Sequence, residues 1–511
     1  MKKSTLIFSV ITLLTFTSVC SAETFYISPT GKDITNGRNE QTPFRTFEHA
    51  FSVIRPGDEL ILLDGIYSIE AETGVISYSD KDRPWSGQPP SGESIGKMTV
   101  VRAKNPGMAI VEGGLFLGRS FRKDSYIKIE GIKFLGGGNL YNTSYVTIKN
   151  CGFHSIRMSG GAVFFIGTND HANGNSYNLI EDCWIWGQER IIAGNYRSDN
   201  NVWRRVVIRG DGCNSVACTG SGNPNVGFTV YESNNISIQN MIVIDRVLDK
   251  GSPYSDFATA QHTEGKYYLG PNEWLGCISL KAPDCGFYFE GDNMDDFTYT
   301  LRDIVAWDSR AGNVNIGSRA LNSVLENITA GMTGKGQDSI RVSPEAHGGI
   351  VRNVIAYKAG RYGVNSSAIP SYCDVYGSNG KRYNQSRGSK GDKAVDPLTG
   401  GRIPSLKYLV RIEEGSELKG TGYKGGDYGA NVIKRYGVDG TRYGDPGYNV
   451  LTDEDLWPWP NEDRIKSDMS SASKRGFCAD GTTLTKYIWE YLGNKIPEEI
   501  YGKGNEEKNG Q

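Results

Sequence analysis

A hexad of alternating apolar and polar residues recurs along this 511-residue chain and restricts its possible folds more than any other feature. The copies begin 19 to 63 residues apart, and the longest interval predicts a further, hidden copy near residues 277–289. A strand-forming repeat of roughly 20 to 45 residues is typical of a solenoid. The copies are IEGIKF from Ile129, IKNCGF from Ile148, IEDCWI from Ile180, WRRVVI from Trp203, IQNMIV from Ile238, LRDIVA from Leu301, LENITA from Leu325 and VRNVIA from Val351.

The positions within the hexad predict two short strands joined by a bend. The first and fourth residues are apolar, and the third is Gly, Asn or Asp in every copy except the one with Arg205. These three residue types tolerate left-handed backbone angles, so we expect the bend at the third position. Coils stacked about 4.8 Å apart would align the bends in a ladder. The pattern therefore predicts an all-β chain, wound as a single-stranded parallel β-helix.

Two other columns of the hexad are expected to face outward. The second position mostly alternates in charge from Glu130 to Arg352, as stacked opposite charges do. We therefore interpret Arg302 and Arg352 as structural. The fifth position is polar at Lys133 but mostly apolar from Trp184 onward. An apolar strip outside a solenoid needs a cover, and the C-terminal part of the chain is the candidate.

The beginning of the chain carries a second specific pattern. Residues 24–68 combine a strand, a Gly/Asn-rich loop, a short helix expected around residues 44–53, the segment PGDEL and a strand ending in DGIYS. This order resembles the entry segment of secreted right-handed parallel β-helix proteins, and with the hexads the resemblance covers roughly residues 24–370. It implies a right-handed solenoid with an N-terminal capping helix, since an uncapped end exposes core and unpaired backbone. Many such proteins are polysaccharide lyases or related carbohydrate-active enzymes.

Three segments are expected along the chain. Residues 1–22 form a signal peptide, with Lys2 and Lys3 before an apolar run, which predicts a secreted protein in the periplasm, at the cell surface or outside the cell. Residues 23–375 form the β-helix. Residues 376–511 form a loop-rich extension that packs along the solenoid, with short helices at 462–474 and 482–492. Aromatic residues of this extension either bind sugars or, as we favour, dock it: Trp457, Trp459, Tyr487, Trp489 and Tyr491.

Charge and cysteine content narrow the expected partners. The net charge is -2, so no basic field indicates nucleic acid, and no further apolar run of membrane length predicts a span. We expect a monomer. Export permits disulfides, and the spacings of Cys213 with Cys218 and of Cys277 with Cys285 would each allow a closed loop, although the sequence leaves the pairing open.

The candidate ligand site lies between long excursions of neighbouring coils, at residues 154–176, 209–234, 245–275 and 290–297, which we expect to wall one cleft. Residues expected to bind substrate there are Tyr254, Tyr267, Tyr268, Trp274 and His171. Hard oxygen ligands suit Ca²⁺, so the acidic cluster of Glu290, Asp292, Asp295 and Asp296 is either a calcium site or a solvated turn.

Cleavage of an acidic polysaccharide by β-elimination needs a group that neutralises the uronate carboxylate and a base that takes the α-proton. The candidates are Lys250, Lys281 and Arg246. The segment CISLKAP around Lys281 looks similar to the catalytic-lysine strand of the chondroitinase B and alginate lyase family. That family has acidic calcium ligands immediately before the strand, where this chain has Leu275 and Gly276.

A pectate lyase likeness is weaker still. Where that family carries paired aspartates, this chain reads SRAGNVNI and KAGRYGVN. The first hypothesis is therefore a polysaccharide lyase acting on an acidic, uronate-containing polymer. The alternatives are a non-catalytic polysaccharide-binding protein of the cell surface or matrix, and a glycoside hydrolase, which would need two facing carboxylates.

Overall fold

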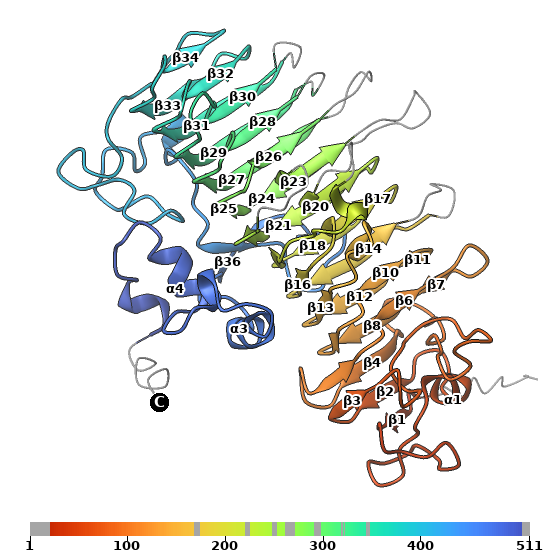
Figure 1. The fold of residues 1–511 in the computed structure, drawn as a ribbon. Coiled ribbons are helices and arrows are strands. Elements are labelled where there is room, and N and C mark those ends of the chain that lie inside the picture. Colours follow the sequence, from red (N-terminus) through yellow and green to blue (C-terminus); the bar gives the residue numbers. More distant parts are fainter. Residues whose placement is uncertain are drawn as a thin grey trace, which may run out of the picture.

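The protein is a rod of stacked coils (Figure 1). This computed structural model describes residues 21–167, 174–219, 225–247, 253–260, 271–290, 298–317, 320, 322–343 and 348–502. Within them, every strand of the rod pairs with its neighbours in parallel, so the predicted all-β, right-handed parallel β-helix is confirmed. The signal peptide prediction concerns residues 1–22, of which 1–20 lie outside the described residues.

The hexads build the first sheet, and each coil contributes two short strands or one long bent strand to it. Its strands are β1 (Thr24–Ile27), β2 (Glu59–Leu62), β3 (Gly65–Tyr67), β4 (Thr99–Ala103), β5 (Ala109–Val111), β8 (Ile127–Glu130), β9 (Lys133–Phe134), β12 (Thr147–Lys149), β13 (Gly152–Ser155), β15 (Leu179–Glu181), β16 (Trp184–Gly187), β18 (Val202–Arg204), β19 (Val207–Gly210), β21 (Ser237–Gln239), β22 (Ile242–Ile244), β24 (Asn272–Leu275), β25 (Ile278–Leu280), β27 (Tyr299–Trp307), β29 (Val324–Gly331), β31 (Ile350–Tyr357) and β33 (Ser371–Tyr376).

A second parallel sheet closes each coil, and part of it lies within the segments that the sequence suggested were loops. Three of the four predicted excursions contain its strands. These strands are β6 (Leu115–Leu117), β10 (Gly138–Leu140), β14 (Ala162–Gly167), β17 (Ile191–Tyr196), β20 (Asn225–Tyr231), β23 (Pro253–Ala260), β26 (Cys285–Phe289), β28 (Val314–Ile316), β30 (Ile340–Val342), β32 (Val364–Ser366) and β34 (Tyr383–Asn384). The solenoid pairing therefore continues to β34, beyond residue 375.

The bends occur at the predicted third position of the hexad. Each residue there has a positive φ between 46° and 73°, and the set includes Arg205 as well as Gly276, which belongs to the hidden copy starting at Trp274. The residues are Gly131, Asn150, Asp182, Arg205, Asn240, Gly276, Asp303, Asn327 and Asn353. At Gly276 a Cβ atom would lie 2.4 Å from the Asn240 side chain, so this bend also needs glycine for space.

The first position of each hexad faces the core. Neighbouring copies pair in register, as Ile148 does with Ile129 and Ile180, and these side chains have at most 2% of their surface exposed. The second position forms the expected ladder of ion pairs. Glu181 contacts Lys149 at 2.6 Å and Arg204 at 2.8 Å. Arg302 and Arg352 both contact Glu326, which confirms their structural role.

Helix α1 (Phe47–Val53) covers the first end of the rod (Figure 1). It begins at Phe47, three residues after the earliest start that we expected. The Oγ1 atom of Thr46 caps it by accepting a hydrogen bond from the backbone N–H of His49 at 3.3 Å. Phe47, Ala50 and Phe51 are buried in the main core, so the helix closes that core.

The C-terminal extension returns along one side of the rod (Figure 1). It contains β35 (Lys434–Tyr436) and β36 (Leu451–Asp455), which are antiparallel, the helices α3 (Glu462–Ser470) and α4 (Leu484–Trp489), and the short 3₁₀ turns η2 (Tyr423–Gly425), η3 (Gly476–Cys478) and η4 (Glu498–Ile500). The remaining elements are α2 (Val216–Thr219) and the paired strands β7 (Asp124–Ser125) and β11 (Thr143–Ser144).

The extension covers the apolar strip formed by the fifth hexad position. Trp184, Val207 and Ile242 of the strip are fully buried and belong to one cluster with the extension. The residues that cover the strip include Leu406, Tyr408, Leu409, Leu418, Tyr428, Leu456, Trp457, Trp459, Ile465, Met469, Leu484, Ile488 and Trp489. The three tryptophans are therefore docking residues, as favoured from the sequence. The boundary at 375/376 itself stays a prediction.

Among the described residues, no helix has the length and apolar character needed to cross a bilayer. Cys213 and Cys218 form a disulfide, whereas Cys277 and Cys285 are both free and buried. Cys277 occupies the core-facing fourth position of the hidden hexad, which explains why it is not available for pairing.

Candidate functional site

The outward positions of the second sheet form one column that runs from strand to strand, and its middle part, at Gly194, Thr229 and Ala258, is buried. Parallel pairing in register places one outward residue of each strand above the next. Phe116, for example, is partly exposed between Leu115 and Leu117, which are fully buried. The column consists of Phe116, Asn139, Phe165, Gly194, Thr229, Ala258, Tyr288, Asn315, Arg341 and Asn365.

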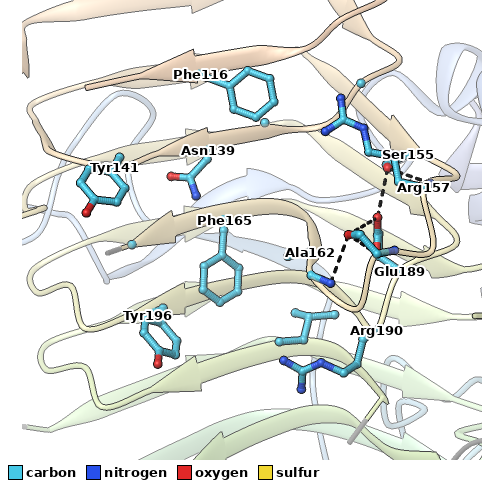
Figure 2. Close-up of a pocket in the computed structure, with 16 residues that line it drawn as sticks. Phe116, Asn139, Tyr141, Ser155, Arg157, Ala162, Phe165, Glu189, Arg190 and Tyr196 are labelled. Carbon is cyan, nitrogen blue, oxygen red and sulfur yellow. Dashed lines mark hydrogen bonds between the residues drawn. The ribbon is translucent and has the colours of Figure 1, made fainter. Parts of the chain in front are cut away.

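A cleft of about 430 Å³ lies over the first four strands of this sheet (Figure 2). Phe116, Asn139 and Phe165 form its floor, and Tyr141 and Tyr196 stand along one side. The rings of Phe165 and Tyr196 are 5.7 Å apart, and all five side chains are partly exposed. Flat aromatic faces with a few polar groups are typical of sites that bind small or repeating ligands such as sugars.

Two arginines stand on the opposite side of this cleft from the tyrosines (Figure 2). Arg157 is exposed at the rim. Arg190 is partly buried, and its Nε atom donates a hydrogen bond to the carbonyl of Gly160 at 2.9 Å. Burial lowers the pKa of Arg190 from its ordinary value, but a guanidinium remains charged at neutral pH. Guanidinium groups bind carboxylates and sulfates well, so this side favours an anionic ligand.

The wall that carries these arginines is held by Glu189. Its carboxylate is 4% exposed and accepts hydrogen bonds from the backbone N–H of Ser159 at 2.9 Å and from the Ser155 hydroxyl at 3.4 Å. Behind the wall, α2 lies against Gly160, where a Cβ atom would come within 2.8 Å of the Ala217 carbonyl. The disulfide between residues 213 and 218 closes the α2 loop, so the wall is braced from behind.

Neither acidic cluster of the described residues suits a calcium ion. In the first, Glu181, Asp182 and Asp439 lie within 4.8 Å of one another, but Arg205 already contacts Asp182 at 2.5 Å and Asp439 at 2.7 Å. The other cluster joins Glu189 to the two cysteines, whose sulfurs are bonded to each other. Calcium prefers a set of oxygen ligands with uncompensated charge, so both clusters are structural.

The structure brings together two of the predicted catalytic residues, Arg246 and Lys281, at a corner of the rod. Arg246 is held in place because its guanidinium donates to Asp256 at 3.1 Å and to the carbonyls of Ser255 and Asn225. Lys281 is exposed in a left-handed conformation, with φ of 56°. The corner lies outside the cleft of Figure 2, so neither side chain lines that cleft.

The structure corrects the assignment of Trp274. Its indole is fully buried, because Trp274 is the first, core-facing residue of the hidden hexad and pairs with Ile238 and Leu301. A side chain without exposed surface cannot stack on a sugar. The sequence placed it at the end of a loop, because the hidden copy was expected a few residues later.

Glu290, the predicted metal ligand that the structure describes, does not lie beside Lys281. It directly follows β26, whereas Lys281 precedes this strand, so the five strand residues separate them by about 16 Å. Burial, together with the neighbouring carboxylate of Glu290, raises the pKa of Tyr288 to about 12. The remaining candidates lie outside the described side chains: Lys250, His171, Tyr254, Tyr267, Tyr268, Asp292, Asp295 and Asp296.

Sequence reasoning missed the aromatic cleft, although a signal was present. Each strand of the second sheet is a short segment with alternating or glycine-flanked apolar residues, such as AVFFIG from Ala162, NVGFTVY from Asn225 and CGFYF from Cys285. Aligning these segments as a third column of the repeat would have placed Phe165 and its neighbours outward. The hexads are more regular than the segments of the second sheet, so the interpretation of the sequence was based on the hexads alone.

Comparison with known proteins yields likenesses in structure. No protein-family model and no curated protein matches this chain in sequence. Pectate lyase Pel9A is similar over 81% of this chain and 96% of its own, with 16% identity and a TM-score of 0.42. XylC in complex with xylose is similar over 73% and 86%, with 8% identity and a TM-score of 0.46.

A rhamnogalacturonan lyase is similar over 77% of this chain and 92% of its own, with 14% identity and a TM-score of 0.34. The parallel β-helix that the sequence resemblance implied is found in the chain's own strand pairing. At these values the likeness is one of fold, and it assigns no reaction to this chain.

Proposed function

We propose that this protein binds an acidic polysaccharide along the outer face of the second sheet and cleaves it as a lyase. The observation that carries the proposal is the cleft in which Phe116, Phe165 and Tyr196 face Arg157 and Arg190. Aromatic faces suit sugar rings, and guanidinium groups suit uronate carboxylates. A polymer laid along the rod meets a new strand about every 4.8 Å, so the outward column offers it successive contacts.

For β-elimination, Arg157 and Arg190 would neutralise the carboxylate and so acidify the α-proton. The proton acceptor in this proposal is Lys250, a sequence-based candidate outside the described residues, because Lys281 does not line this cleft. Calcium is proposed as a second means of neutralising charge, held by Asp292, Asp295 and Asp296, which lie outside the described residues.

Binding without cleavage is the second candidate function, and the composition of the cleft favours it over hydrolysis. Among the described residues that line the cleft, Glu189 is the only carboxylate. Its oxygens accept hydrogen bonds from Ser155 and Ser159. A glycoside hydrolase needs two facing carboxylates, so the described lining does not supply that pair.

The test is to incubate the mature protein with a panel of uronate polymers and follow the absorbance of the unsaturated product, with and without a chelator. We expect the absorbance to rise, and the double variant Arg157→Ser/Arg190→Ser to lower the rate at least tenfold. Arg402→Ser, which removes an exposed arginine outside the cleft, is the matched control. New reducing ends without absorbance would indicate a hydrolase, and binding alone would indicate the second candidate. Absence of binding to any polymer would end the proposal.

A further inference from the structure

A second cleft, of about 580 Å³, lies at the corner where the first sheet ends and the chain turns toward the second sheet. Its lining residues come from successive coils, from the segments that follow β22, β25, β27, β29 and β31. This corner cleft shares no residue with the cleft of Figure 2. Its volume lies within the range of about 300 to 1,000 Å³ that is usual for ligand sites.

The lining of the corner cleft is rich in positive charge. Lys281, Arg310 and Lys358 are exposed there, and none of them forms an ion pair with a carboxylate in the described part of the chain. Asp308 is the single acidic residue among the described lining residues, and it accepts a hydrogen bond from the Tyr491 hydroxyl at 3.2 Å. Arg246 is compensated by the buried Asp256. Three cations against one anion favour an anionic ligand.

A buried hydroxyl in the same cleft also lacks a partner. Ser309 lines the cleft and is 2% exposed, and its Oγ atom makes no hydrogen bond with any described residue. Buried polar groups are nearly always paired, because an unpaired one has given up its hydration without compensation. The Ser309 hydroxyl is therefore a group that a polar ligand can satisfy, and this observation does not depend on the charge of the lining.

The C-terminal extension contacts one lining residue, Lys281, through helix α4 and the residues that follow it. The Lys281 ammonium lies 3.3 Å from the Tyr487 hydroxyl, 5.7 Å from the centre of the Tyr487 ring and 5.4 Å from that of Tyr491. These contacts hold the exposed ammonium of Lys281 at the cleft, where it can meet an anion. Because Lys281 does not line the cleft of Figure 2, Lys250 is left as the candidate base there.

We propose that the corner cleft binds one anionic sugar residue, with Lys281, Arg310 and Lys358 around its carboxylate or sulfate and the Ser309 hydroxyl bonded to one of its oxygens. The extension then has a second role beyond covering the apolar strip, because Tyr487 and Tyr491 hold Lys281 at this site. The site is separate from the cleft of the proposed function and would hold a chain end or a side branch. It can therefore be tested with a ligand too short to require the outer face of the second sheet.

The experiment is calorimetric titration with digalacturonate, with a sulfated neutral disaccharide and with inorganic sulfate, at low and high salt. We expect at least one of the two sugars to bind more tightly than inorganic sulfate. We also expect its affinity to fall at least tenfold in Lys281→Ser/Arg310→Ser and to weaken with salt. The sugar that binds identifies the anionic group. Equal binding of inorganic sulfate, or no binding of either sugar, would overturn the proposal.

The matched control is Lys123→Ser/Arg387→Ser, which removes the same two charges from exposed positions elsewhere. It should bind like the parent protein, and an equal loss would show a general charge effect. A second readout is acetylation of lysines in the full chain, followed by mass spectrometry. The sugar should lower labelling of Lys281 and Lys358 but leave Lys123 unchanged. Loss of polymer cleavage in the Arg157→Ser/Arg190→Ser variant with retained disaccharide binding would separate the two sites.

Discussion

Two outward columns of the same solenoid differ in their exposure to solvent. The fifth hexad position of the first sheet, from Trp184 to Ile355, is fully buried beneath the extension. On the second sheet, the outward column from Phe116 to Arg341 keeps partly exposed aromatic rings. Exposed apolar rings beside arginines are typical of a surface that contacts a partner or ligand, and this contrast motivates the ligand proposed for that face.

The difference also concerns polar contacts. The covered face is joined to the extension by specific polar contacts, such as the buried bond from the Tyr436 hydroxyl to Asp303 at 2.5 Å and the partly buried ion pair of Lys133 with Asp468 at 2.8 Å. Buried polar groups need such partners, so the extension is fixed in one register on the rod.

The largest effect on the free energy of unfolding is expected from disrupting the packing of the extension on the apolar strip. Trp489 is fully buried, with its ring 5.1 Å from Tyr408 and 6.2 Å from Trp457. Trp489→Ala should lower the free energy of unfolding by about 3 to 5 kcal/mol, because it leaves a cavity in the interface. Urea unfolding measures this. A loss below about 1 kcal/mol would mean that the extension does not stabilise the rod.

The next effect depends on pH. Burial raises the pKa of Asp303 to about 6, well above its ordinary value, although Tyr436 and Asn431 donate hydrogen bonds to the carboxylate. Since the folded pKa is higher than the unfolded one, the stabilisation is complete below about pH 4 and is lost as the pH rises through 6. The loss should reach at most about 3 kcal/mol. Asp303→Asn should flatten this dependence between pH 4 and 7 in urea unfolding.

Asp480→Asn serves as the control for this pH dependence, because the Asp480 side chain is 86% exposed and should not alter it. A parent protein whose stability rises steadily from pH 4 to 7, with Asp303→Asn following the same curve, would contradict the prediction.

A smaller effect is expected from removing the disulfide that braces the wall of the cleft of Figure 2. Cys213→Ser/Cys218→Ser removes the disulfide that closes a short loop, which should cost about 2 kcal/mol or less. This loop braces the wall that carries Arg157 and Arg190. The free energy of binding to a uronate polymer should therefore decrease by more than the free energy of unfolding does. A reducing agent should reproduce the loss in the parent protein and have no further effect on the variant.

The smallest effect on stability is expected from a substitution on the outer face of the second sheet. Phe165 is partly exposed, so Phe165→Ala should change the free energy of unfolding by less than about 1 kcal/mol. Binding of the polymer should nevertheless fall several-fold, since a stacking surface is lost. Phe121→Ala, which removes a ring that is 69% exposed outside the cleft, is the control. Equal binding by both variants would remove Phe165 from the site.

By itself, the sequence determined the rod. A left-handed bend is a local property that Asn150 or Asp182 favours wherever it stands, and even Arg205 conforms once its neighbours in the ladder bend. The alternation of charge and the need for a cover are equally local, so they could be read without coordinates.

The clefts were decided only by the tertiary structure. Phe116 and Tyr196 are 80 positions apart in the chain, and Lys281 meets Tyr491 of the extension across 210 positions. Which side chains come together at such distances depends on the length of each coil and on where the extension lies. A local pattern does not contain this information, and for that reason Lys281, Tyr487 and Tyr491 were each singled out from the sequence but not as neighbours.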